Sequence, residues 1–432
     1  MYATPVDAYG RYEPVTLKNI HDHPGFRRIP EALRHEVEVA AQVLPFRTNP
    51  YVLDELIDWD AVPDDPIFQL VFPQRAMLEP EAFARVEAAL AAGDRDALTR
   101  EVWRVRRAMN PHPAGQLTHN VPELDGRRLA GLQHKYAETV LFFPAGGQTC
   151  HAFCTYCFRW AQFVGDRDLK FESNRVEDLV RYLRAHPEVT DVLVTGGDPM
   201  VMKTALLARY LEPLLEVETL RSIRIGSKSL AYWPMRFTTD PDAAELLRLF
   251  ERVVARGKQL AFMAHFSHPR ELETGPVRAA IQNLLGADAV IRTQAPLVRH
   301  VNDDADVWAE KWRREVSLGL VPYYMFVERD TGPKRYFEVP LAEAQRIFAG
   351  AYRQVSGLAR TVRGPSMSAF PGKVRIVGTA EVAGEKVFVL EFLQARDPSW
   401  VGRPFFARYS ETATWLDELE PAFGAARFFY EA

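Results

Sequence analysis

Three cysteines stand close together in the chain, and their type and spacing point to metal chemistry. Cys150, Cys154 and Cys157 form the pattern C-x3-C-x2-C in the segment CHAFCTYC, and they are the only cysteines among 432 residues. Three thiolates on one short loop can bind three irons of a [4Fe-4S] cluster and leave the fourth iron open to a ligand. A disulfide framework would need an even number of cysteines spread along the chain. We therefore predict that the three thiols bind a metal centre.

A zinc site is the alternative interpretation of the same loop, with His151 or a more distant histidine as the fourth ligand. Zinc sites of this kind usually pair two C-x2-C units, and the sequence has no second unit. The aromatic residues Phe153, Tyr156 and Phe158 alternate with the cysteines and would shield a cluster from water. The pattern favours the iron–sulfur cluster, and the zinc site stays open as an alternative.

The composition is that of an ordinary globular protein with enough apolar residues for a large core. Of the residues, 47% are hydrophobic and 25% are charged. The formal net charge of −4 provides no basic field, so we expect neither nucleic acid nor a membrane surface as a partner. No segment approaches the ~20 apolar residues of a membrane-spanning helix. The first residues also lack the pattern of a signal peptide, and a cytoplasmic protein is expected.

The apolar pattern divides the chain into three parts. Residues 1–137 carry apolar residues at helical spacing and are predicted to form an N-terminal helical region. In residues 138–345, short apolar runs alternate with helical patterns, which predicts a parallel sheet in a closed or partial barrel. The runs are TVLFFPA, DVLVTGG, SIRIGS, LAFMAHF, AVIRTQAPL and VPYYMFV. Residues 346–432 are predicted to form an α+β extension with a hairpin around AGEK, which serves as a lid or an oligomerisation segment.

A glycine-rich segment follows the second of these runs. In TGGDP, Gly196 and Gly197 would let the backbone approach a ligand closely, and Asp198 could neutralise an ammonium group. A plain turn with Asp198 as a helix cap is the simpler alternative. Together with the cysteines, the segment resembles the radical S-adenosylmethionine (SAM) superfamily, whose cluster cleaves SAM to a 5′-deoxyadenosyl radical. The resemblance implies that this segment binds SAM and that the fold is of the α/β class, with a partial parallel (β/α)6 barrel.

A longer set of motifs is similar to the lysine 2,3-aminomutase family and covers roughly residues 50–375. The matching segments are HKYAETVLFF, CHAFCTYCFR, VTDVLVTGGDPM, IRIGSKS, HFSHPRE, TQAPLVRHVND and LVPYYMF. The resemblance implies an isomerase that uses the cluster, SAM and pyridoxal 5′-phosphate (PLP) to move an α-amino group of an amino acid to the β carbon. It also implies an external one-electron reductant of the flavodoxin or ferredoxin type and a homo-oligomer.

Several family positions hold residues suited to the cofactors and the substrate. Lys373 in SAFPGKVRI matches the lysine that carries PLP, and Lys135 matches a basic residue aimed at the PLP phosphate. The arginine that completes this phosphate-binding pair in the family corresponds to Thr139. Arg159 matches the arginine that binds the substrate carboxylate, a task that suits a guanidinium. Gln294 matches a glutamine that contacts SAM or PLP.

Simpler structural roles remain for three of these residues. Lys373 could be a surface lysine at the start of a strand, because the family's glycine run before it is shortened to Pro371 and Gly372. Arg159 could be a solvated charge. His265 in HFSHPRE, which we place among the cofactor-binding residues, could equally be a buried barrel histidine. We predict that Lys373 and Arg159 are the catalytic residues.

The positions that hold the lysine side chain in lysine-specific members differ in this sequence. Two aspartates bind the terminal ammonium there; the first corresponds to Arg329 or its neighbours Glu328 and Asp330, and the second to a position near Ser366. A guanidinium in place of these acids disfavours a cationic side chain. We predict that Arg329 and Asp330 bind the substrate, and that it is an acidic or neutral amino acid rather than lysine.

Three hypotheses for the function follow. The first is a PLP-dependent radical SAM amino acid 2,3-aminomutase, in which Met367 and Phe370 would favour an uncharged substrate. The second is a radical SAM enzyme on the same scaffold with another outcome, such as dehydration, epimerisation or a rearrangement without PLP. The third is a non-enzymatic zinc or iron–sulfur protein. Binding of PLP at Lys373 separates the first two hypotheses, and cleavage of SAM separates both from the third.

Overall fold

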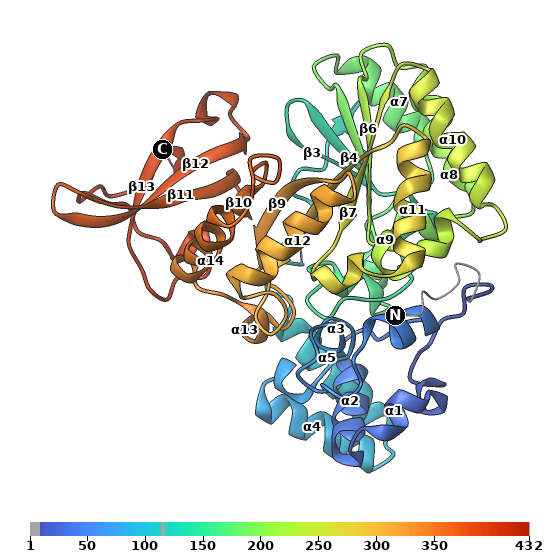
Figure 1. Ribbon diagram of the computed structural model, residues 1–432. Helices are drawn as coiled ribbons and strands as arrows, with labels where there is room; N and C mark the ends of the chain where they lie inside the picture. The colour runs from blue at the N-terminus through green and yellow to red at the C-terminus, as the bar shows by residue number, and fades with distance from the viewer. Residues whose placement is uncertain (1–8, 114–116, 432) are drawn as a thin grey trace.

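The computed structural model describes residues 9–113 and 117–431 and arranges them around one eleven-stranded sheet (Figure 1). The order of strands in this sheet is β13-β12-β11-β10-β9-β8-β7-β6-β5-β4-β3. Residues 1–8, 114–116 and 432, which belong to the predicted first and last parts of the chain, lie outside the described residues. The sheet therefore connects all three predicted parts of the chain.

The central strands of the sheet run parallel and are in register. They are β4 (Thr139–Phe142), β5 (Asp191–Val194), β6 (Ser222–Ser227), β7 (Gln259–His265), β8 (Val290–Leu297) and β9 (Val321–Val327). The first residues of β4, β5 and β6 lie side by side, because Thr139 pairs with Asp191 and Asp191 pairs with Ser222. All of these strands consequently end on one side of the sheet, where the loops that carry the motifs meet.

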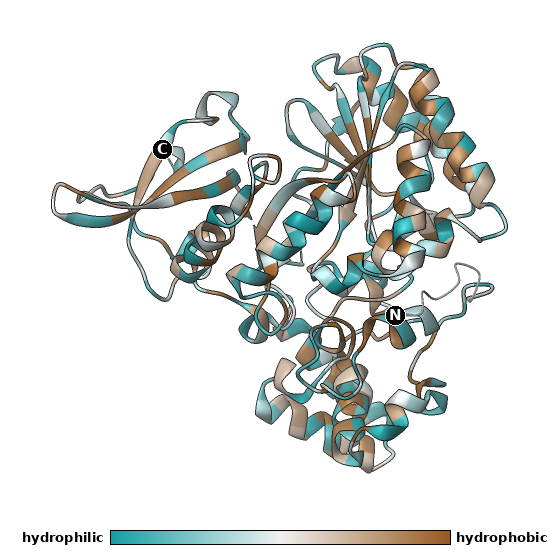
Figure 2. Cartoon of the chain, viewed as in Figure 1, coloured by the Kyte–Doolittle hydropathy of each residue, from teal (hydrophilic) through white to brown (hydrophobic). Residues whose placement is uncertain are grey.

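Helices that connect the parallel strands cover the outer face of the sheet (Figure 1). In α10, Leu246, Leu249, Phe250 and Val253 recur at helical spacing and are fully buried. Figure 2 shows the same division, with brown and teal on different sides of these helices. The covering helices are α7 (Val176–Ala185), α8 (Thr204–Leu215), α10 (Ala243–Ala255), α11 (Gly275–Gly286) and α12 (Ala305–Ser317). Among the described residues, none of the helices is long and apolar enough to cross a membrane.

The parallel strands form an open, curled sheet. On one side β3 (Leu132–Tyr136) pairs antiparallel with β4, and on the other side β10 (Arg363–Ser368) pairs parallel with β9. Within the described residues no hydrogen-bonded strand pairing closes the ring. Tyr136 of β3 and Gln394 of β12 nevertheless line one cavity, so the two sides of the sheet curl toward each other. The predicted α/β class with a partial parallel barrel is confirmed, and the closed barrel that we also considered is not formed.

The N-terminal part is mainly helical but also contains strands. Its helices are α1 (Pro24–Arg28), α2 (Glu31–Val43), α3 (Pro66–Val71), α4 (Pro80–Ala91) and α5 (Arg95–Ala108). Before residue 137 the chain also forms a small hairpin, β1 (Glu123–Leu124) with β2 (Arg127–Arg128), and the sheet strand β3. Helical spacing did not indicate these strands, because β3 is specified by the hydrogen-bonding groups that β4 offers to it rather than by its own apolar pattern. The three-part division of the chain stays a prediction.

The C-terminal part adds antiparallel strands to the sheet. The predicted hairpin is confirmed, because β11 (Gly372–Val382) and β12 (Glu385–Ala395) pair around Ala383 and Gly384. Both turn residues have positive φ, 51° and 79°, as a tight two-residue hairpin requires. The helix α14 (Leu341–Arg353) leads into this part, and the strand β13 (Pro404–Arg408) follows the hairpin. Two short helices, α9 (Ser229–Tyr232) and α13 (Lys334–Phe337), lie in the middle part of the chain, after β6 and β9. The proposed lid or oligomerisation role of the C-terminal part stays a prediction.

Candidate active site

The cysteine loop follows β4 and lies where the parallel strands end. Cys150, Cys154 and Cys157 are all free thiols. The backbone N–H of Cys157 donates to the carbonyl of Cys154 at 3.1 Å, and Sγ of Cys154 lies 4.0 Å from the hydroxyl of Tyr232. Burial raises the pKa of each thiol, to about 12 for Cys157. The structure therefore brings the three predicted metal ligands together in a protected loop.

The chemistry of these donors fits an iron–sulfur cluster. The charges of the other two cysteines further raise the pKa of Cys150, so the three thiols cannot ionise together without added positive charge. Iron supplies that charge. Among the described residues, no three His, Cys, Asp or Glu side chains converge as ligands of a single metal ion. A cubane cluster needs no such convergence, because each thiolate binds a different iron.

His151 is not placed as a zinc ligand. Its Nδ1 lies 2.9 Å from Oγ of Ser229, and its ring packs between Tyr12 and Trp233. Burial lowers the pKa of His151 to about 3, so the ring is neutral. The residue therefore anchors the cysteine loop to α9, and among the described residues no three side chains that could include His151 are placed to hold one metal ion.

Backbone contacts from the N-terminal part hold the cysteine loop. The N–H of Phe153 donates to the carbonyl of Arg47 at 2.9 Å, and the N–H of Thr155 donates to the carbonyl of Leu70 at 2.9 Å. The side chain of Asn49 donates to the carbonyl of Tyr232 at 2.9 Å, which joins the same segment to α9. No motif marks these N-terminal segments, because their contribution comes from main-chain groups that any residue carries.

The glycine segment after β5 packs against the residues that precede Cys150. A Cβ on Gly196 would lie 2.3 Å from Nε2 of Gln148, and a Cβ on Gly197 would lie 2.4 Å from the carbonyl oxygen of Thr149. Gly196 also has a φ of 149°, which side chains rarely permit. The close approach of two loops thus explains both glycines, and their contact with SAM stays a prediction.

Asp198 ties loops together through several hydrogen bonds. Its Oδ1 accepts a hydrogen bond from the N–H of Met200 at 2.9 Å. Its Oδ2 accepts from the N–H of Lys228 and from the hydroxyls of Ser227 and Ser229, at 2.9 to 3.0 Å. These donors leave little capacity for an ammonium group. Asp198 thus has the capping contact of the simpler alternative, and its contact with SAM stays a prediction.

A buried ion pair joins the loops after β6 and β7. Nζ of Lys228 lies 2.7 Å from Oε1 of Glu271, whose side chain is fully buried. The same ammonium contacts the carbonyl of His265 at 3.3 Å and lies 4.5 Å from the ring centroid of Tyr232, next to Cys154. The sequence analysis did not assign this pair, although both residues belong to the quoted motifs IRIGSKS and HFSHPRE.

Arg159 is buried beside the cysteines with unused hydrogen-bonding capacity. Its guanidinium lies 4.4 Å from the ring centroid of Phe143, and its Nη2 donates to Gln148 at 3.2 Å and to Gln162 at 2.6 Å. Its Nε is buried and has no partner. Burial lowers the pKa of Arg159 to about 10, so the group is still cationic at neutral pH. A guanidinium with a free donor and no acid partner is a suitable site for a carboxylate.

Lys373 is the second residue of β11 and extends over aromatic rings of β9. Its Nζ lies 4.1 Å from the ring centroid of Tyr324 and 5.4 Å from that of Phe326. Among the described residues it has no hydrogen-bond or ion-pair partner. Burial, together with the nearby charges of Arg224 and Arg363, lowers the pKa of Lys373 to about 7. The surface-lysine alternative does not fit this position.

Lys135 lies on β3 in the same cationic region. Its Nζ donates to the carbonyl of Ala369. Burial, together with the nearby charges of Arg396, Arg329 and Lys373, lowers its pKa to about 7. Lys135 and Lys373 are therefore close enough to repel one another, although they are far apart in the sequence. An anion bound between them would relieve this repulsion.

His265 and Gln294 are neighbours across the parallel strands β7 and β8. Nδ1 of His265 lies 3.4 Å from the hydroxyl of Tyr156 in the cysteine loop. Burial lowers the pKa of His265 well below its usual value, so the ring is neutral. Both predicted cofactor-binding residues thus lie next to the cysteine loop, and their contacts with SAM or PLP stay predictions.

The predicted substrate residues follow β9. Cζ of Arg329 lies 5.5 Å from the ring centroid of Phe158 and 5.6 Å from that of Trp415, and its Nε lies 3.8 Å from Oδ1 of Asp330. Asp330 is oriented toward His112, with its Oδ2 3.1 Å from Nε2 of the histidine. Arg329 and Asp330 thus form an ion pair with each other, Asp330 also contacts His112, and their binding of the substrate stays a prediction.

Two apolar residues that we considered for the substrate lie elsewhere. Met367 is fully buried in the apolar core that strands β10, β11 and β12 share. Phe370 is exposed and lies under the guanidinium of Arg396, 4.2 Å from its ring centroid. The prediction was wrong for Met367, because alternate residues of a strand face opposite sides and Met367 faces the core.

The chain is similar in sequence to named amino acid isomerases. A candidate L-lysine 2,3-aminomutase of Aquifex aeolicus (strain VF5) is 32% identical over 402 residues, which are 93% of this chain and 95% of that protein. The chain belongs to the lysine 2,3-aminomutase family. The L-lysine 2,3-aminomutase of Clostridium subterminale is 29% identical over 227 residues, 52% of this chain and 51% of that protein. No protein-family model matches the chain.

The solved structures that resemble this chain do so only distantly. SuiB of Streptococcus suis bound to S-adenosylmethionine covers 62% of this chain and 56% of its own, with 12% identity and a TM-score of 0.36. A radical SAM methyltransferase from Sphaerobacter thermophilus covers 64% and 92%, with 14% identity and a TM-score of 0.37. Because both TM-scores are low, the fold is assigned from the strand pairing described above.

Membership of the lysine 2,3-aminomutase family makes the chain a radical SAM isomerase of the aminomutase class. Enzymes of this family use a [4Fe-4S] cluster, SAM and PLP. Their substrates are free amino acids, and they need a reductant. The cysteine loop and the enclosed amine of Lys373 have the chemistry that such cofactors require.

Proposed function

We propose that the chain is a PLP-dependent radical SAM amino acid 2,3-aminomutase that acts on an acidic or neutral amino acid. The observation that carries this proposal is the amine of Lys373, which lies over Tyr324 and has no hydrogen-bond or ion-pair partner in the part of the chain that the structure describes. A lysine with a pKa of about 7 is largely neutral at physiological pH and can attack an aldehyde. The cluster and SAM would supply a radical that removes a hydrogen atom from the substrate, and PLP would hold the migrating nitrogen.

The charges around the site support a substrate without a cationic side chain. Arg159 offers an unpaired donor for the α-carboxylate. Arg329, whose Nε lies 3.8 Å from Oδ1 of Asp330, is a second cation and lies near enough to Lys135 to lower its pKa. A side-chain ammonium of the substrate would add to this repulsion, whereas a distal carboxylate would relieve it.

Trapping of the cofactor tests the role of Lys373. Under anaerobic conditions, the cluster-reconstituted protein is incubated with PLP, reduced with borohydride and digested for peptide mapping. We expect one pyridoxyl adduct, on Lys373, and its loss in Lys373→Ala. Lys386→Ala is the control, because Lys386 lies on β12 over Tyr409, outside the site. An adduct that persists in Lys373→Ala, or none in the parent protein, would contradict the proposal.

The reaction itself is tested with a panel of amino acids. With SAM and a one-electron reductant, we expect a β-amino isomer from an acidic or neutral amino acid and little from lysine. A dehydrated or epimerised product without a β-amino acid would favour another reaction on the same scaffold. Turnover of lysine above all others would contradict the assignment of Arg329.

A further inference from the structure

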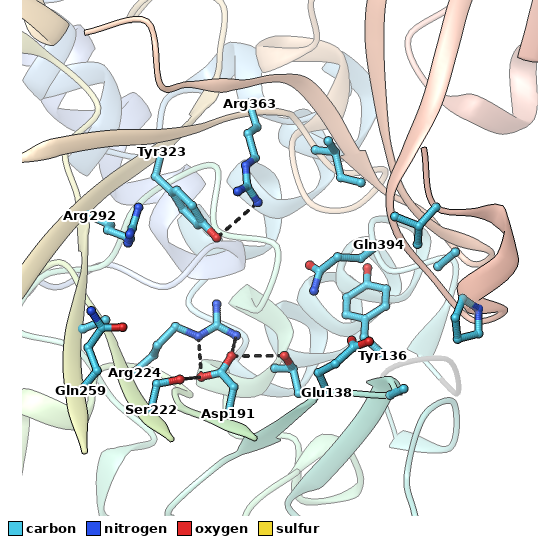
Figure 3. A pocket seen from close by; sticks show the side chains of 17 residues that line it. Tyr136, Glu138, Asp191, Ser222, Arg224, Gln259, Arg292, Tyr323, Arg363 and Gln394 are labelled. Atoms are coloured by element: carbon cyan, nitrogen blue, oxygen red, sulfur yellow. Dashed lines mark hydrogen bonds and ion pairs between the residues drawn. The ribbon is translucent and has the colours of Figure 1, made fainter. Parts of the chain in front are cut away.

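A cavity of about 470 Å³ lies at the base of the curled sheet, where the parallel strands begin (Figure 3). It is lined by residues at the beginnings of the parallel strands, among them Thr139, Asp191, Arg224, Arg292 and Tyr323. Strands begin at this base and end at the cysteine loop, so the cavity lies on the far side of the barrel from the radical chemistry. None of the roles assigned above uses it.

Two arginines in this cavity have no acid partner. Arg224 is neutralised by Asp191, whose Oδ1 accepts from its Nε at 3.0 Å. Arg292 and Arg363 instead flank Tyr323, each with its Cζ 5.0 Å from the ring centroid (Figure 3). Neither forms an ion pair among the described residues. Two guanidinium groups directed at one cavity without counter-ions are a site for an anion.

The cavity adjoins the amine of Lys373. Nζ of Lys373 and Cζ of Arg363 lie over the same ring, 4.1 Å and 6.0 Å from the centroid of Tyr324. Gln394, which pairs with Lys373 across β11 and β12, also lines the cavity. The positive charges of Arg224 and Arg363 lower the pKa of Lys373. A molecule attached to Lys373 is therefore within reach of the arginines.

The expected phosphate clamp of the family is incomplete in this chain. Thr139 stands where the resemblance implies a second arginine, and its hydroxyl donates to Oδ2 of Asp191 at 3.1 Å. Thr139 lines the same cavity as Arg292 and Arg363. The arginine that the family has on β4 is thus absent, but Arg292 of β8 and Arg363 of β10 bring positive charge to the same cavity. The acids that line it, Asp191 and Glu138, are outnumbered by its three arginines.

We propose that Arg292 and Arg363 bind the phosphate group of PLP in this cavity, with Arg224 as a further donor. The inference rests on the proposed function, because it takes Lys373 as the residue that holds PLP. Planar guanidinium groups give a phosphate two parallel hydrogen bonds each, and the hydroxyl of Tyr323 lies between the two side chains. An acidic substrate could present a carboxylate of similar chemistry, and the test separates the two sources.

Comparison of PLP with pyridoxal, which lacks the phosphate, isolates this contact. Dissociation constants for both compounds are measured by absorbance on the parent protein, Arg292→Gln and Arg363→Gln. We expect each variant to weaken PLP binding roughly tenfold or more, about 1.4 kcal/mol, and to leave pyridoxal binding unchanged. Inorganic phosphate should compete with PLP in the parent protein and less in the variants. Arg408→Gln is the control, because Arg408 is exposed on β13 and pairs with Glu385.

Each other outcome overturns the inference in a recognisable way. Equal affinity of the parent protein for PLP and pyridoxal, with both trapped on Lys373, would leave the proposed function intact and remove the phosphate site. An equal loss of affinity for PLP and for pyridoxal in the variants would show that the arginines have only a structural role. Unchanged PLP binding with a raised KM for the amino acid would assign the cavity to a substrate carboxylate. Capture of neither compound by Lys373 would overturn the proposed function and this inference together.

Discussion

The cysteine loop and the region around Lys373 are built in different ways. At the cysteine loop, main-chain groups make the decisive contacts, such as the N–H of Phe153 on Arg47 and the close approach of Gly197 to Thr149. Around Lys373, side chains from separate strands determine the chemistry, and several cations there lack acid partners. A close backbone approach such as that of Gly197 to Thr149 restricts the residue type at its position, whereas a pocket of side chains can change without disturbing the fold. The comparison explains why the first region resembles its family closely and the second departs from it.

Removal of one cluster ligand would have the largest effect. In Cys154→Ala we expect complete loss of SAM cleavage and of bound iron, because the remaining thiolates cannot hold the cluster. Iron per chain and the formation of 5′-deoxyadenosine are measured after anaerobic reconstitution. Lys386→Ala should keep both. Cleavage of SAM by a Cys154→Ala sample of known iron content would show that the three cysteines do not hold the cluster that cleaves SAM.

A methyl group at the glycine segment tests the backbone-built region without removing a cysteine. In Gly197→Ala the new Cβ would meet the carbonyl of Thr149, so we expect the free energy of unfolding to fall by about 1–3 kcal/mol and cluster retention to fall with it. Gly286→Ala is the matched control, because a Cβ there meets nothing within 4 Å. Equal denaturant midpoints for the two variants would show that the two loops do not pack as described.

Reversal of one charge tests the side-chain-built region. In Arg329→Asp we expect kcat/KM to shift toward cationic amino acids by roughly tenfold, about 1.4 kcal/mol, relative to acidic ones. Arg335→Asp is the control, because Arg335 is exposed and pairs with Glu79 at the surface. If neither variant changes the preference across an amino acid panel, Arg329 does not contact the substrate.

A change of pH should have a smaller and graded effect on the same region. The pKa of Lys373 is lowered to about 7, so the neutral amine that attacks PLP increases about tenfold per pH unit below pH 7 and levels off above it. We expect the rate of PLP capture, followed by absorbance between pH 6 and 9, to show this plateau. A rate that still rises tenfold between pH 8 and 9 would mean that Lys373 titrates like an exposed lysine.

The sequence was sufficient for the fold and the cysteine loop but not for the contacts between distant segments. Alternation of apolar runs and helical patterns predicted the parallel strands, and spacing alone predicted which thiols meet. The anchoring of Phe153 by Arg47 was not predictable, because it uses main-chain groups. The face of the sheet to which Met367 points depends on the strand register, and a shift of one residue would turn the side chain to the other face. The cavity between Arg292 and Arg363 depended on the curl of the sheet, for which the sequence carries no local signal.

Migration of nitrogen is the most direct test of the central claim. The reconstituted protein is supplied with SAM, PLP, a one-electron reductant and amino acids labelled with ¹³C at the α and β carbons and with ¹⁵N, and the products are analysed by NMR. We predict that an acidic or neutral amino acid yields a product in which ¹⁵N is coupled to the β carbon. Formation of 5′-deoxyadenosine with ¹⁵N still on the α carbon of every amino acid would contradict the assignment as an aminomutase.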